Sequence, residues 1–242
     1  LSKNTALKGL YCQSNQLTSL DVRNNTALVW LRCDSNKLTS LDLSNNDAFN
    51  VLTCYDNQLT SLDVSGKTAL NQLHCYENQL TSLNVSGCTA LERLYCENNR
   101  LTSLDVSGFT SLDKLRCNDN QLTSLNVSGC TALAELTCGS NRLTSLDLTD
   151  CTALTAFDCG IQSYDIGDVS GSYDLSRLPK GFDPARASSW SGAAYDSGAN
   201  ALKNFYAKTV TYIYDCGSGN TMGVELTLNY QGAVADVVIN EE

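Results

Sequence analysis

The side chains with the richest potential chemistry in this 242-residue sequence are its twelve cysteines. Eight of them recur at a constant step of 21 residues, at Cys12, Cys33, Cys54, Cys75, Cys96, Cys117, Cys138 and Cys159. A regular column of equivalent side chains places neighbouring Cβ atoms about 4.8 Å apart, whereas a disulfide needs about 3.8 Å and zinc needs a tetrahedral cluster. The spacing therefore predicts a column of buried thiols that pack as small apolar residues and hold no metal.

Four cysteines lie outside this column. Cys88, Cys130 and Cys151 belong to a second column, which also contains Asn25, Asn46, Lys67 and Phe109, and Cys216 stands alone near the end. A disulfide that involves Cys130, Cys151 or Cys216 stays open at this point. So many cysteines without an evident pairing scheme argue against a strongly oxidising environment.

Acidic side chains form a third column. Its members are Asp21, Asp42, Asp63, Asn84, Asp105, Asn126 and Asp147. Stacked carboxylates could bind Ca²⁺, which prefers several oxygen ligands. Side-chain capping of the turn that follows is the alternative, and asparagine performs it as well as aspartate does. Because two of the seven members are asparagines, we favour capping.

The sequence offers little on which to build an active site. His74 is the only histidine, and no nucleophile stands at a recognisable spacing from it. The chain contains no phosphate-binding loop, no dinucleotide-binding glycine pattern and no zinc-protease motif. We therefore predict a protein that is not an enzyme and uses no cofactor.

Charge and hydropathy exclude two classes of partner. Lys and Arg number 16 against 26 Asp and Glu, which gives a net charge of −10, so the chain has no basic excess with which to bind a nucleic acid. No apolar run approaches the roughly 18 residues of a membrane span, so we expect no membrane insertion. An export signal and a surface anchor are expected outside this segment, because the chain begins in the middle of a repeat.

The 21-residue step governs two thirds of the chain. Residues 7–27 read LKGLYCQSNQLTSLDVRNNTA, and the pattern recurs through seven full coils. It resembles the leucine-rich repeat, with Leu7, Leu10, Cys12, Asn15 and Leu17 at its signature positions. The short length and the internal echo within each coil are similar to the nested IRREKO subclass of bacterial internalin-like surface proteins. The resemblance implies a right-handed solenoid with parallel sheets in a secreted or cell-surface protein.

The pattern within each coil predicts two extended segments. Strand alternation turns Leu10 and Cys12 inward and leaves Tyr11 outward in the first segment, and the second segment repeats this logic. Between them, Asn15 and its equivalents are expected to form a buried ladder that binds backbone groups where the chain turns.

The repeat pattern ends after Cys159, where Gln162 replaces the next asparagine. Residues 209–215 and 222–230 alternate in polarity around a glycine-rich turn and predict a hairpin, and residues 234–239 offer a further strand. We predict a solenoid over residues 1–159 and a small antiparallel β-sandwich, immunoglobulin-like, over residues 160–242. This second unit would close the open end of the solenoid.

Variation among the coils is concentrated on one surface. The Thr-Ser pair of the second segment is identical in all seven coils, whereas the outward positions around the first segment vary freely. The variable positions include aromatic and arginine residues, which dominate binding hot spots. We predict a ligand-binding face that contains Tyr11, Trp30, Arg32, Tyr55, His74, Tyr76, Arg93, Tyr95 and Arg116.

The expected partner is a protein on a host or neighbouring cell, and the step to adhesion rests on the family resemblance. Two alternatives stay open. The first is a carbohydrate bound by the aromatic residues of the face or by Trp190, Tyr195 and Tyr206 of the tail. The second is a purely structural stalk that carries a domain outside this segment.

Overall fold

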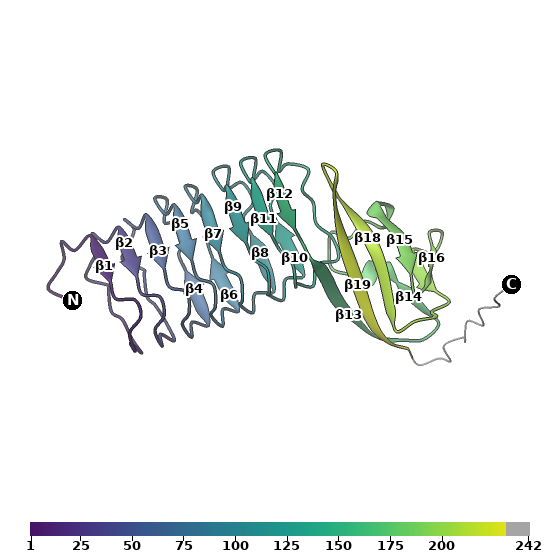
Figure 1. The fold of residues 1–242 in the computed structure, drawn as a ribbon, viewed down its shortest axis with the longest axis horizontal. Coiled ribbons are helices and arrows are strands. Elements are labelled where there is room, and N and C mark those ends of the chain that lie inside the picture. The colour runs from purple at the N-terminus through teal and green to yellow at the C-terminus, as the bar shows by residue number, and fades with distance from the viewer. Residues whose placement is uncertain (231–242) are drawn as a thin grey trace.

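The computed structural model describes residues 1–230, and the strand expected over residues 234–239 lies outside them. The first segments of the coils form one parallel sheet, which we call the front sheet (Figure 1). Its order is β1 (Gly9–Tyr11), β2 (Trp30–Arg32), β3 (Val51–Thr53), β5 (Gln72–His74), β7 (Arg93–Tyr95), β9 (Lys114–Arg116), β11 (Glu135–Thr137) and β12 (Ala156–Asp158). The coils therefore stack in register, as the 21-residue step predicts.

Leucine and cysteine side chains fill the solenoid. Leu31, Cys33 and their equivalents in the central coils have no exposed surface. All twelve cysteines are free thiols. In the second column, the Sγ atoms of Cys130 and Cys151 donate to the carbonyls of Val106 and Val127, 24 residues earlier. The structure thus gives these cysteines a hydrogen-bonding role in place of the bridge that the sequence left open.

The predicted asparagine ladder is present. The Nδ2 atom of Asn99 lies within 3.2 Å of the carbonyls of Cys75, Cys96 and Glu97, and its Oδ1 accepts from the Leu80 amide at 2.9 Å. The ladder also extends one step further than expected. Gln162 is completely buried and binds Cys138, Cys159 and Leu143 with its side-chain amide.

The second segments of the coils lie on the opposite side of the solenoid (Figure 1). Only four of them form strands, and these associate as two separate parallel pairs. The pairs are β4 (Ser61–Asp63) with β6 (Ser82–Asn84), and β8 (Ser103–Asp105) with β10 (Ser124–Asn126). The second segments therefore pair as strands in only four of the coils.

The acidic column caps turns, as predicted. The side-chain oxygen of Asp63 accepts a hydrogen bond at 2.8 Å from the Ser65 amide. The same hydrogen bond, donated by the backbone amide two residues later, is accepted by the side-chain oxygens of Asp21, Asp42, Asn84, Asp105, Asn126 and Asp147. Aspartate and asparagine are interchangeable in this role because the bond needs only an oxygen acceptor.

Residues 160–230 form a β-rich cap at the end of the solenoid. One sheet has the order β13 (Ile161–Val169), β19 (Asn220–Tyr230), β18 (Thr209–Gly217) and β15 (Ala187–Ser191). The other has the order β14 (Ser172–Asp174), β17 (Ala201–Lys203) and β16 (Ala194–Asp196). Two 3₁₀ turns, η1 (Leu175–Arg177) and η2 (Pro184–Arg186), complete the cap. No helix among the described residues is long and apolar enough to span a membrane.

The cap confirms the predicted hairpin, because β18 and β19 pair in an antiparallel manner. The expectation of purely antiparallel sheets is wrong, since β13 pairs with β19 in parallel. β13 follows β12 of the last coil after two residues and forms the edge of this sheet. The rings of Trp190 and Tyr195 stack on each other, and Trp190 also stacks on the buried ring of Tyr212.

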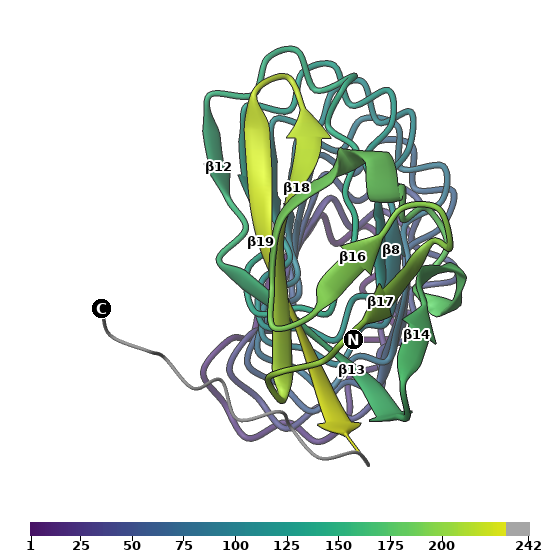
Figure 2. The same cartoon turned by 90° about the vertical axis from the view of Figure 1, so that its right-hand side faces the viewer.

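Several contacts join the cap to the last coil. Tyr212 donates its hydroxyl to the Thr144 carbonyl at 2.7 Å, and the Leu148 amide donates to the Cys216 carbonyl at 2.8 Å. Figure 2, which views the molecule from the cap end, shows the cap strands lying across the end of the stacked coils. The cap thereby covers the apolar interior that the last coil would otherwise expose.

Candidate functional site

The front sheet displays its outward side chains in three parallel columns. The first column precedes the buried leucine and contains Gly9, Trp30, Val51, Gln72, Arg93, Lys114 and Glu135. The second follows that leucine and contains Tyr11, Arg32, Thr53, His74, Tyr95, Arg116 and Thr137. The third follows the buried cysteine and contains Gln13, Asp34, Tyr55, Tyr76, Glu97, Asn118 and Gly139. All nine residues predicted for the ligand-binding face occupy these columns.

Two aromatic stacks run across the strands in the middle of the face. The rings of Tyr55 and Tyr76 lie 4.3 Å apart and nearly parallel, with an interplanar angle of 7°. The rings of His74 and Tyr95 lie 4.7 Å apart, and the Arg116 guanidinium sits 4.9 Å from the centre of the Tyr95 ring. Stacked neighbours restrict each other's rotamers, so this part of the face is ordered before any partner arrives.

Tyr11 and Trp30 are not drawn into these stacks. They lie at the end of the face that is farthest from the cap, on β1 and β2, and their exposed fractions are 63% and 43%. These two rings therefore present the most accessible apolar surface of the nine predicted residues.

A buried carboxylate fixes the beginning of the Tyr55–Tyr76 stack. Asp34 is only 2% exposed, and it accepts hydrogen bonds from the Thr53 hydroxyl at 3.1 Å and from the Tyr55 hydroxyl. The Arg32 Nε atom lies 3.6 Å from the same carboxylate. Burial and the neighbouring Tyr55 hydroxyl raise the pKa of Tyr76 to about 12. Both tyrosines therefore remain protonated and present hydroxyl groups at neutral pH.

A second ion-pair cluster lies toward the cap. The carboxylate of Glu135 contacts Lys114 Nζ at 2.8 Å and Arg116 Nη2 at 2.7 Å, and these two hydrogen-bonded cations lower the pKa of Glu135. Sequence reasoning included Arg116 but missed Asp34, Thr53, Lys114 and Glu135. The charges of Lys114 and Glu135 are separated by one 21-residue step, so the repeat itself contained the signal for that pair.

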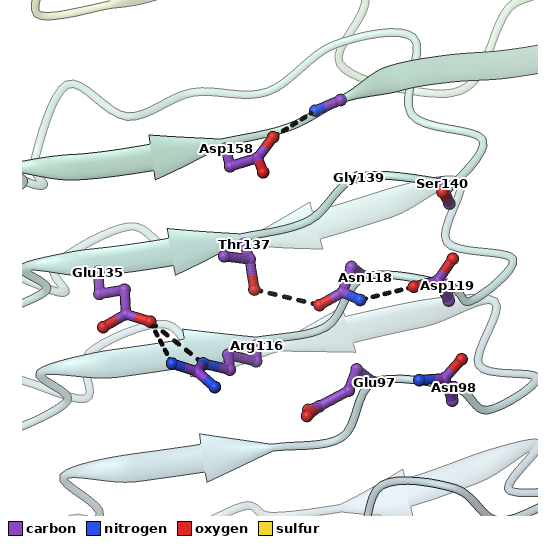
Figure 3. Close-up of a pocket in the computed structure, with 11 residues that line it drawn as sticks. Glu97, Asn98, Arg116, Asn118, Asp119, Glu135, Thr137, Gly139, Ser140 and Asp158 are labelled. Atoms are coloured by element: carbon purple, nitrogen blue, oxygen red, sulfur yellow. Dashed lines mark hydrogen bonds and ion pairs between the residues drawn. The ribbon is translucent and has the colours of Figure 1, made fainter.

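A polar hollow of about 540 Å³ lies beside this cluster. Figure 3 shows the residues that line it. Arg116, Glu135 and Thr137 line one part of it, and Thr137 donates to the Asn118 side chain at 3.1 Å. Further acidic groups line it at Glu97, Asp119 and Asp158, which belong to the coils of Cys96, Cys117 and Cys159. Burial is the main cause that raises the pKa of Glu97 above its ordinary value. The face is thus aromatic and basic in its middle and acidic near the cap.

Comparison with known proteins places this geometry in a wider context. The family model described as Leucine Rich repeats (2 copies) matches residues 89–129. No curated protein matches the chain.

Several solved bacterial structures are similar to the chain. The functional domain of InlJ from Listeria monocytogenes, which includes a cysteine ladder, is 22% identical, with 94% of this chain and 82% of that chain covered at a TM-score of 0.41. YopM, a leucine-rich effector protein from Yersinia pestis, is 24% identical, with 64% of this chain and 44% of that chain covered at a TM-score of 0.57. The internalin-like protein lmo2027 of Listeria monocytogenes is 16% identical, with 87% and 75% covered at a TM-score of 0.45.

The chain spans less than half of YopM, so that likeness concerns the solenoid fold alone. The repeat match and the stacked parallel strands agree with each other. Residues 89–129 thus match leucine-rich repeats, and they lie within a mainly β solenoid whose fold is similar to that of a bacterial leucine-rich effector protein.

Proposed function

We propose that this chain is a non-enzymatic protein-binding module and that its partner docks on the front sheet. The observation that carries the proposal is the contrast between the two sides of the same coils. The three front columns differ from coil to coil, whereas the Thr-Ser pairs of the back are identical. Leucine-rich repeats generally serve as protein-interaction modules, and the varied side belongs to a continuous sheet.

The order of the face supports binding of a large partner. Tyr55, Tyr76, His74 and Tyr95 are already stacked, so binding restricts few additional side-chain rotamers. The sheet extends over eight strands, which at the usual strand spacing corresponds to roughly 30 to 35 Å along the solenoid. That length suits a protein surface better than a small molecule.

Further parts of the proposal concern the context of the module. The repeats belong to the short, cysteine-containing 21-residue subclass, and the module divides into a solenoid over residues 1–159 and an immunoglobulin-like cap over residues 160–242. The protein is exported to the bacterial surface or medium and contributes to adhesion. The resemblance of the repeats to those of internalin-like proteins supports these statements, and cell fractionation of the producing bacterium tests the location.

Site-specific photocrosslinking tests the docking face. A benzophenone amino acid replaces Tyr95 on the front in one variant and Thr102 on the back in a matched variant, and each is irradiated with candidate cell-surface proteins. We expect adducts from the Tyr95 variant that an excess of the unlabelled wild-type chain suppresses. Adducts of the same proteins in equal yield from the back position would contradict docking on the front sheet.

A carbohydrate partner is the second candidate, and the exposed rings of Tyr11 and Trp30 on adjacent strands favour it. In the cap, Trp190 and Tyr195 pack against the core, so the version of this hypothesis that uses the tail loses two of its three residues. A glycan array probed with the wild type and with Trp30→Ala distinguishes the candidates. Binding that requires Trp30 would favour the carbohydrate.

A further inference from the structure

The front sheet differs in charge from the rest of the molecule. The chain contains 16 basic and 26 acidic residues, yet the three front columns, extended to Asp158 on β12, contain four basic and four acidic side chains. The charges are also separated across the sheet. All four cations stand in the first two columns, while Asp34 and Glu97 stand in the third. An acidic protein therefore carries one surface on which a negatively charged partner meets little repulsion.

The cations are concentrated on β7 and β9. Arg93 and Lys114 are register partners in the first column, so two like charges lie directly opposite each other. Such a pairing costs stability unless a counter-charge neutralises it. Glu135 is the available carboxylate, and it is shared between Lys114 and Arg116. Among the described residues Arg93 forms no ion pair, and its buried Nε atom has no hydrogen-bond partner.

His74 lies on the adjacent strand β5, where Tyr95 is its register partner and Arg93 its diagonal neighbour. Its ring is stacked on Tyr95, and its buried Nε2 atom has no hydrogen-bond partner. Burial and then the positive charges of Arg93 and Arg32 lower the pKa of His74, Asp34 opposes them, and Arg116 adds to them. Two buried polar atoms without hydrogen-bond partners, Arg93 Nε and His74 Nε2, thus belong to neighbouring strands, and Arg93 is the front-column cation that forms no ion pair among the described residues.

We propose that Arg93, Lys114 and His74 form an anion-accepting patch on the front sheet, and that the partner presents the carboxylates of an acidic segment to it. This inference rests on the proposed function and specifies the chemistry of the partner. Arginine binds carboxylate in a bidentate manner, and its remaining N–H groups are suited to that contact. The backbone amides of β7 and β9 are engaged in the sheet ladder, so the patch lacks the N–H cradle that phosphate sites use.

The single histidine makes the test specific. The imidazole NMR signals of His74 report on this patch alone, because the chain has no other histidine. The wild type is titrated with a peptide of alternating Glu and Ser, with a matched peptide of alternating Lys and Ser, and with inorganic phosphate, each to millimolar concentration. We expect the Glu peptide alone to shift the His74 signals and to raise the pKa of His74, because a bound carboxylate stabilises the imidazolium.

Two matched variants separate the patch from general electrostatics. Arg93→Gln introduces the residue that the preceding coil carries as Gln72, and Arg100→Gln introduces the residue that other coils carry as Gln79 and Gln121. Both variants are therefore compatible with the repeat and change the net charge equally. We expect Arg93→Gln to weaken binding of the Glu peptide roughly fivefold or more, and Arg100→Gln to leave it unchanged.

Equal responses to the Glu and Lys peptides, no response to either, or equal effects of the two variants would overturn the proposal. Phosphate that displaces the Glu peptide at equal concentration would overturn it as well, because the patch would then be a simple anion site. None of these results depends on the photocrosslinking experiment. The proposal that a partner docks on the front sheet can therefore stand even if the proposal of an acidic segment is rejected.

Discussion

At the scale of single residues, the buried asparagine of each coil shows how one side chain fixes a turn. Asn36 binds the carbonyls of Cys12, Cys33 and Asp34 with its amino group and accepts from the Leu17 amide with its oxygen. It thereby joins its own coil to the preceding one. Its amide group, with both donors and an acceptor, satisfies backbone groups that would otherwise be buried without partners.

Replacing one ladder asparagine should therefore be costly. We expect Asn99→Ala to lower the free energy of unfolding by about 3 kcal/mol, because buried backbone groups lose their partners. Asn15→Ala serves as the control, since Asn15 is exposed and binds only the carbonyls of Cys12 and Gln13. Urea denaturation measures both variants, and an equal loss in the two would contradict a role that depends on burial.

The protonation of His74 provides a second prediction at this scale. Its folded-state pKa lies below the ordinary value for histidine, mainly through burial and then through Arg93 and Arg32. The unfolded chain therefore takes up a proton first as the pH falls, and the His74 contribution to stability is lost between about pH 6.5 and the lower folded pKa. NMR titration should show that Arg93→Gln raises the pKa of His74. A pKa that is unchanged in this variant would mean that Arg93 does not act on the ring.

At the scale of elements, the back of the solenoid shows that register alone does not make a sheet. In both strand pairs the first strand ends in aspartate and the second in asparagine, as with Asp63 beside Asn84. Hydrogen bonds from Ser65 are the main causes that lower the pKa of Asp63, and the Asn84 side chain adds to them. At Asp105, burial opposes the lowering, which comes from Ser107 and then from Asn126. The segments at Asp21 and Asp42, where three aspartates follow one another, form no strand, and β6 does not pair with β8 although Asn84 and Asp105 are neighbours in the column.

Introducing aspartate at position 84 should weaken such a pair. We expect Asn84→Asp to destabilise the fold by about 1 kcal/mol, because it removes a donor and adds a carboxylate opposite Asp63. The loss should shrink at high salt. Asn24→Asp, at an exposed corner, makes the same charge change as a control. Thermal unfolding at low and high salt measures the effect, and an equal loss in both variants would point to net charge alone.

The sequence allowed the front sheet, the asparagine ladder and the capping oxygens to be predicted, because each repeats at one step and needs one residue type. The second cysteine column was harder to interpret, because chemically different residues perform one task there. Lys67 is 3% exposed and donates to the Leu43 carbonyl, just as Asn46 donates to Val22 and Cys88 to Val64. Any side chain with a donor at the right reach serves there, so residue identity did not reveal the role.

The candidate site was predictable in place but not in arrangement. The repeat places His74 and Tyr95 in one column, and the structure confirms that register. Stacking, the burial of Asp34 and the shared Glu135 depend on side-chain rotamers, which periodicity does not specify. The cap lacks any repeat, so only its hairpin could be predicted from alternation.

At the scale of the whole molecule, stability in a solenoid is approximately a sum over coils and their interfaces. The cap adds one such interface, in which Tyr212 is 1% exposed and donates to the Thr144 carbonyl. A change at this interface should therefore loosen the cap and the last coil while the middle of the solenoid stays closed.

The twelve thiols report this behaviour coil by coil. Burial is the largest cause that raises the pKa of both Cys54 and Cys216 to about 12. Neither thiol therefore forms appreciable thiolate at pH 8 in the folded chain. Pulses of iodoacetamide at increasing urea, read by mass spectrometry, should label the half-buried Cys12 before the buried thiols. In Tyr212→Phe, Cys216 and Cys159 should become reactive at lower urea than in the wild type, because the Thr144 carbonyl loses its partner. The urea concentration at which half of Cys54 is labelled should stay at its wild-type value. A shift of equal size at Cys54 would show that the chain unfolds as one unit.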